Sequence, residues 1–224
     1  MKINRKIKTR LAQIAYIQDK TEMIQAIHNI YPAAHIRPIY VPRTDTECFC
    51  LRVDDTFIFG ASGTESFKDL LIDTKCHLSD YRCGGRVHSG FQDVFDSIRE
   101  KLQKSFLDLF RFGHLDNLVF LGHSLGAEIA MGAADIIHEL VTPDKVNEQI
   151  TTWGCPNGWN KEARERFELR HPNVLHIQNP MDYVTWMQGI TTGRPWDGHG
   201  DRFLKLSGKW GHRLGTYILN GGGE

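Results

Sequence analysis

The sequence predicts one α/β domain with a mostly parallel central sheet and helices on both faces. Short apolar runs typical of buried strands alternate along the chain with longer segments in which apolar residues recur at helical spacing. A chain of 224 residues can bury one large core, and no Pro-, Gly- or Ser-rich linker divides this sequence. We therefore expect residues 1–224 to form a single domain.

The N-terminal half supplies the first strands and a long helix. Residues 1–45 form a helical lead-in, whose first helix includes the apolar run 11–17. Two β-runs follow at 48–53 and 56–59, and only a tight turn separates them. A long helix is predicted over 91–110, because its apolar residues recur three and four positions apart.

The C-terminal half continues the alternation. Residues 118–121 are all apolar, as expected for a parallel strand that is buried on both faces. A helix is predicted over 125–140, and strands at 150–153 and 174–177 are separated by a charged helix at 161–170. These strands would extend the same sheet.

Composition and charge exclude several classes of function. The 27 basic and 27 acidic side chains cancel, so overall charge gives no case for a nucleic-acid partner. No stretch reaches the roughly 18 to 20 apolar residues that span a bilayer. The basic start leads into an apolar run that is too short and too interrupted for a signal peptide. We therefore expect a cytoplasmic protein without an integral membrane segment.

The cysteines indicate neither disulfides nor a metal site. Their number is odd and their spacing lacks the CxxC pattern of zinc sites, so free thiols are expected at Cys48, Cys50, Cys76, Cys83 and Cys155.

The basic residues of the N-terminus allow two interpretations, transient contact with an anionic lipid surface or a solvated terminal face. They are Lys2, Arg5, Lys6, Lys8 and Arg10. The oligomeric state is not indicated by the sequence.

The most informative motif is Gly122-His123-Ser124-Leu125-Gly126, which matches the G-x-S-x-G nucleophile elbow. It follows a predicted buried strand and opens a predicted helix, the setting in which a sharp turn exposes the serine. Neighbouring chain comes close to both glycines in such a turn, so larger side chains would collide. An ordinary serine in a Gly-rich turn is the alternative. We predict that Ser124 is the nucleophile and that His123 is a packed, hydrogen-bonded residue.

Two further segments give the motif a family context. Val87-His88-Ser89-Gly90-Phe91 precedes it, and Trp153-Gly154-Cys155-Pro156 follows it. In this order the three segments resemble the class 3 lipases, the fungal triacylglycerol lipase-like family, and the resemblance covers about residues 57–217. It implies an α/β-hydrolase fold and a serine lipase or esterase that cleaves carboxylic esters of lipids.

The acid of the triad should follow the serine, because α/β-hydrolases place Ser, then Asp or Glu, then His along the chain. Asp182 follows the strand predicted at 174–177, and its surroundings resemble the family's short Asp-containing turn. Asp182 is therefore the predicted acid. Asp197 and Asp201 are the rivals, and a purely structural turn is the remaining alternative.

The base should lie beyond Asp182, which leaves His199 and His212. Residues 211–217 resemble the family's ending, in which the catalytic histidine opens a short helix, so His212 is the predicted base. His199, between two glycines in a loop, is the alternative. His171 and His176 precede Asp182, and His88 precedes the serine; we take His88 as structural.

The resemblance also implies an oxyanion hole. In the family a strand ends in an Arg-Gly-Ser/Thr turn, and here the corresponding residues are Ser62, Gly63 and Thr64. Thr64 and the backbone N–H of Leu125 are the predicted donors. Ser62 stands where the family usually has Arg, which changes how the loop is braced but keeps the backbone donor.

The implied chemistry is double displacement through an acyl-enzyme, which needs no cofactor or metal. The substrate would be a lipid or a small acyl ester. Two other functions stay open. The same triad could act on a thioester or an amide, or transfer the acyl group to an acceptor other than water, as a thioesterase or acyltransferase does. The fold could also serve as a non-catalytic binding module.

Residues 65–86 are a possible lid, because class 3 lipases carry a mobile helix at this place. Phe67, Leu70 and Leu71 would form one apolar face of a short helix. A helix packed permanently on the core is the alternative.

Overall fold

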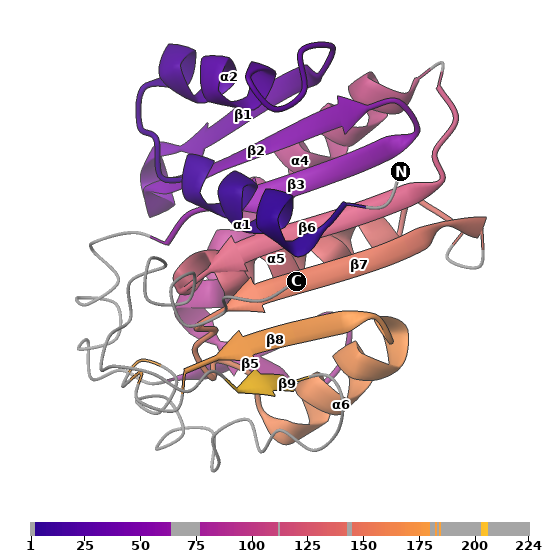
Figure 1. Ribbon diagram of the computed structural model, residues 1–224. Helices are drawn as coiled ribbons and strands as arrows, with labels where there is room; N and C mark the ends of the chain where they lie inside the picture. The colour runs from indigo at the N-terminus through magenta and orange to yellow at the C-terminus, as the bar shows by residue number, and fades with distance from the viewer. Residues whose placement is uncertain are drawn as a thin grey trace.

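The computed structural model describes residues 3–63, 77–111, 113–142, 145–179, 182, 184 and 203–205. Within these residues the main sheet has the strand order β1-β2-β3-β6-β7-β8-β9 (Figure 1). The strands are β1 (His35–Val41), β2 (Thr46–Val53), β3 (Thr56–Ala61), β6 (Asn117–His123), β7 (Asn147–Trp153), β8 (Val174–Gln178) and β9 (Phe203–Lys205). The two pairs β1–β2 and β2–β3 are antiparallel, and the other four are parallel. The predicted mostly parallel sheet is confirmed.

Helices cover both faces of this sheet, as the sequence predicts (Figure 1). One face carries α1 (Arg5–Ile14) and α2 (Lys20–His28), and the other carries α4 (Ser89–Phe110), α5 (Leu125–His138) and α6 (Lys161–Arg170). A hairpin of β4 (Leu78–Asp80) and β5 (Arg86–His88) forms a separate two-stranded sheet, and a short 3-10 helix spans Pro42–Thr44. No helix in the described ranges is both long and apolar enough to cross a membrane.

Strand β6 shows why residues 118–121 are all apolar. Leu118 and Phe120 belong to the core beneath α4 and α5, whereas Val119 and Leu121 belong to the core beneath α1 and α2. Successive side chains of a strand point to opposite faces, so covering both faces of the sheet favours apolar side chains at successive positions.

Strand β1 is the main element that the sequence does not indicate. It lies within the predicted helical lead-in and forms one edge of the sheet. Half of its side chains face solvent and it contains Pro38, so it lacks the apolar run by which the other strands are recognised.

The cysteines of the described part, Cys48, Cys50, Cys83 and Cys155, carry free thiols. This agrees with the prediction for those four positions. The predicted lid lies mostly outside the described residues, which leave out 64–76.

Candidate active site

Ser124 occupies the turn between β6 and α5, where the sequence places the nucleophile. Its backbone has φ 59° and ψ −130°, a conformation that costs energy in a residue with a side chain. The Ser124 N–H donates to the carbonyl of Trp153 at 2.9 Å, which ties the turn to the end of β7. A strained, fixed serine between a buried strand and a helix is the geometry of a nucleophile elbow.

The two glycines of the motif are required by close backbone contacts. A Cβ on Gly122 would lie 1.9 Å from the carbonyl oxygen of Gly126. A Cβ on Gly126 would lie 2.3 Å from the carbonyl oxygen of Ala61, at the end of β3. The elbow therefore packs directly against the strand that leads into the predicted oxyanion loop.

That loop approaches Ser124 from the other side. A Cβ on Gly63 would lie 3.0 Å from Ser124 Cβ, so the chain passes beside the nucleophile just before Thr64. Ser62 is buried, and both its N–H and its hydroxyl donate to the carbonyl of Glu47 at 3.3 Å. Serine thus braces the loop against β2 at the position where the family usually has Arg.

Leu125 is the first residue of α5, and it is buried. The first N–H groups of a helix have no partner within the helix and lie at its positive end. The Leu125 N–H is therefore suited to donate a hydrogen bond to a negatively charged oxygen next to Ser124. Thr64, the other predicted donor, lies outside the described residues.

Tyr16, which the sequence does not single out, reaches the site from the end of α1. Its hydroxyl hydrogen-bonds with His123 Nδ1 at 2.6 Å, and the Gly63 backbone also bonds to it. Burial raises the pKa of Tyr16 to about 12, although the Gly63 contact lowers it, so the hydroxyl stays protonated. One side chain thus connects the elbow, the oxyanion loop and the N-terminal helix.

Asp182 is fully buried and follows β8. Its N–H donates to the carbonyl of Asn179 at 2.9 Å, and its Oδ1 accepts from the Val184 N–H at 3.0 Å. Ser124 and Asp182 both lie at the carboxyl ends of parallel strands, with β7 between β6 and β8. The remaining candidates, His199, His212, Asp197 and Asp201, lie outside the described residues.

The histidines that we took as structural have structural contacts. His123 is packed and bonded to Tyr16, as predicted. His88 precedes α4, and its Nδ1 accepts from the Gly90 N–H at 3.2 Å, which caps the helix. Burial lowers the pKa of His88, so it caps the helix as a neutral ring. His176 hydrogen-bonds with Thr152 at 2.7 Å.

Glu128 is a second residue that sequence reasoning missed. It lies one turn into α5, fully buried, and its carboxylate accepts from the backbone N–H of Gly158 at 3.0 Å and from the indole N–H of Trp159. Burial raises the pKa of Glu128 to about 8, against the effect of these hydrogen bonds. The only signal in the sequence is an acid among the small and apolar residues in the first turn of the predicted helix.

Helix α5, which follows Ser124, is thereby bonded to the segment that follows β7. His88 also donates its N–H to the carbonyl of Gly158, at 2.8 Å. All three segments of the family resemblance therefore meet around α5.

A groove of about 510 Å³ lies at the β1 edge of the sheet, lined in part by Tyr40, Glu47 and Lys101. Of the predicted site residues that the structure describes, Ser124, Leu125 and Asp182, none lines it. The groove is therefore not the place where substrate would meet Ser124.

Comparison with known proteins agrees with this geometry. Residues 58–192 match the model of the family "Lipase (class 3)", which is more than half of the chain. Phospholipase A1-IIdelta of Arabidopsis thaliana is 39% identical over 79 residues, which are 34% of this chain and 19% of that protein. The chain thus spans about a fifth of the length of this curated relative.

Solved lipase structures share the fold. A Rhizomucor miehei lipase propeptide complex superposes with a TM-score of 0.65 at 22% identity, covering 80% of this chain and 59% of that one. The M37 lipase superposes with a TM-score of 0.70 at 10% identity, covering 97% and 89%. The fold is therefore that of the α/β-hydrolases.

Proposed function

Because this chain belongs to the class 3 lipase family, we propose that it hydrolyses carboxylic esters of lipids with Ser124 as the nucleophile. The observation that carries the proposal is the conformation of Ser124, φ 59° and ψ −130° between β6 and α5. Such strain is maintained where a side chain must be held for chemistry. The names of the relatives, a phospholipase A1 and a fungal lipase, support an acyl ester of a lipid as substrate.

In the proposed mechanism, His212 removes the proton of Ser124 as the serine oxygen attacks the ester carbonyl. Asp182 orients the imidazole and stabilises its charged form. The N–H of Leu125 and a donor from Thr64 stabilise the oxyanion. The alcohol leaves with the proton from His212, and water then hydrolyses the acyl-enzyme by the same steps in reverse.

Labelling with a fluorophosphonate probe tests the nucleophile. We expect wild type to be labelled, and Ser124→Ala to lose both the label and ester turnover, with a loss of several orders of magnitude in kcat and an unchanged circular dichroism spectrum. Wild-type turnover in the variant would refute the assignment. Absence of labelling and turnover in wild type would favour a non-catalytic binding module.

A substrate panel tests the reaction and its class. We expect p-nitrophenyl esters to be hydrolysed faster than acyl-CoA thioesters or anilides, because the family cleaves oxygen esters. Rates from C2 to C16, below and above the solubility limit, distinguish a lipase from an esterase. An abrupt rise when substrate forms droplets indicates a lid that opens at an interface, and smooth saturation indicates a plain esterase.

A further inference from the structure

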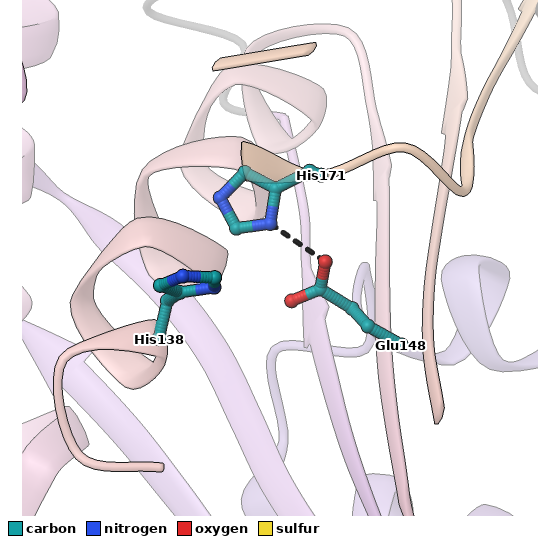
Figure 2. A group of neighbouring side chains, drawn as sticks. All are labelled: His138, Glu148 and His171. Carbon is teal, nitrogen blue, oxygen red and sulfur yellow. Dashed lines mark hydrogen bonds and ion pairs between the residues drawn. The ribbon is translucent and has the colours of Figure 1, made fainter. Parts of the chain in front are cut away.

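Three potential metal ligands meet at the end of the sheet opposite Ser124. His138 is the last residue of α5, Glu148 is the second residue of β7, and His171 directly follows α6. Figure 2 shows their side chains converging from these three elements, and one ligand atom from each lies within 4.8 Å of the other two. Because Glu148 lies near the start of its strand and Ser124 follows the end of β6, this cluster is separate from the proposed active site.

His171 is held in one orientation by two carboxylates. Its Nδ1 lies 2.6 Å from Glu148 Oε1, the bond drawn in Figure 2, and its Nε2 lies 3.0 Å from Asp135 Oδ1. The ring is fully buried. The contact with Asp135 fixes the ring so that Nδ1 faces Glu148, on the side where the three residues meet.

Asp135 is itself fixed by several donors. Arg170 forms a bidentate bond with it, Nε to Oδ1 at 2.7 Å and a second guanidinium nitrogen to Oδ2 at 2.9 Å, and the Tyr81 hydroxyl donates to Oδ2 at 2.7 Å. A carboxylate that receives the second N–H of a metal-binding histidine is a common part of such sites, because it fixes the ring and increases its basicity. Asp135 has this position relative to His171.

The cluster is also accessible from solvent. His138 is half-buried and the Glu148 side chain is 13% exposed, whereas His171 closes the inner side. The rings of His138 and His171 lie 5.1 Å apart between centroids.

We propose that His138, Glu148 and His171 bind a divalent transition-metal ion of the Zn²⁺ type. Two imidazole nitrogens and one carboxylate oxygen are a ligand set that suits zinc, with a water molecule as the fourth ligand. The bound ion replaces the proton that His171 Nδ1 and Glu148 Oε1 share in their hydrogen bond. This proton is released to solvent. The ion joins the ends of α5 and α6 to β7, so its role is to stabilise the fold.

Thermal unfolding with and without zinc tests the site. Full-length protein is stripped with a chelator, and its Tm is then measured at pH 7.5 while ZnCl₂ is added. We expect the Tm to rise by about 5 °C or more when free zinc is a hundred times Kd. His138→Gln and Glu148→Gln should each lose most of this rise. Both positions are partly exposed, so these variants should fold. His35→Gln, on β1 at the far edge of the sheet, should keep the full rise.

Cobalt gives an independent readout of the ligands. Co²⁺ added to the stripped protein should produce visible d–d absorption without the strong charge-transfer bands of thiolate ligation, and zinc should abolish this absorption. An equal zinc effect in His138→Gln and wild type would overturn the proposal, as would the absence of any zinc effect in wild type. Thiolate charge-transfer bands would place the metal on cysteines and would also overturn it. None of these results depends on Ser124 being catalytic.

Discussion

The Tyr16 hydroxyl is the side-chain contact between the N-terminal helix and the proposed nucleophile. It bonds with His123 Nδ1 and with the backbone of Gly63; His123 precedes Ser124 in the chain, and Gly63 lies beside it in space. Tyr16→Phe should lower the free energy of unfolding by about 1 to 3 kcal/mol, because it leaves buried polar groups without a partner. We expect kcat to fall as well, but far less than in Ser124→Ala. Denaturant unfolding and ester kinetics measure both effects.

Tyr40→Phe is the matched control, since Tyr40 is 51% exposed on β1. It should leave stability and turnover at wild-type values. If Tyr16→Phe behaved like Tyr40→Phe in both assays, the Tyr16 contact would have no role in organising the site.

His212→Ala and His199→Ala together identify the base. A base acts in both acylation and deacylation, so its loss should collapse kcat, whereas a loop histidine near substrate mainly alters KM. We expect the collapse of kcat for His212→Ala alone. The reverse pattern would transfer the role to His199.

The residues predicted from sequence are those whose signal is local. Ser124 lies in a five-residue motif whose strand and helix adjoin it, and Asp182 lies in the turn shortly after β8. Tyr16 is 107 positions from His123, and Glu128 is 31 from Trp159, so no short pattern links either pair. Likewise, the three proposed metal ligands belong to separate elements and meet only when the sheet forms.

At the scale of elements, the buried carboxyl of Glu128 joins α5 to the segment after β7. A glutamate in an unfolded chain has a pKa near 4.5, and folding raises it to about 8. Between these values the folded state binds one more proton than the unfolded state, so stability must fall as pH rises through this window. The slope has an upper limit of about 1.4 kcal/mol per pH unit.

Glu128→Gln should remove this dependence, because glutamine does not titrate. We expect the free energy of unfolding of the variant, minus that of wild type, to increase steadily from pH 5 to pH 8. Above pH 8 this difference should level off. Denaturant unfolding across this range gives the two curves. Glu100→Gln, which removes an exposed carboxylate from α4, should follow wild type. Parallel curves for Glu128→Gln and wild type would contradict the ionisation of Glu128.

Helices and strands were predictable where the local sequence carries a clear signal, either a helix-capping residue or a run of apolar residues that is buried in the fold. Helix α6 has the predicted bounds, and the Asn160 side chain caps it by accepting from the Ala163 N–H at 2.9 Å. Strands β6 and β7 were found from their buried runs; β6 extends beyond the predicted 118–121 at both ends, whereas β7 begins before the predicted 150–153 and ends with it at Trp153. Strands β1, β4, β5 and β9 were not predicted, because β1 lies at a solvated edge and the others have only three residues each.

At the scale of the whole molecule, the family match begins at residue 58 but the folded unit begins earlier. Helices α1 and α2 cover one face of the sheet, and β1 and β2 extend it. Without them, Ile58, Val119 and Leu121 would lose the layer that covers them. The N-terminal segment thus forms the core on one face of the sheet, and through Tyr16 it also reaches the site.

Leu11→Ala tests this dependence of the whole fold on its first helix. Leu11 is fully buried in the core beneath α1, so its truncation should leave a cavity and lower the free energy of unfolding by about 2 to 5 kcal/mol. Leu107→Ala, at a position 54% exposed on α4, removes the same atoms from the surface and should cost far less. One cooperative transition at lower denaturant is the expected outcome for Leu11→Ala. An unchanged main transition would show that the sheet is stable without α1 and that the N-terminal segment is an independent addition to it.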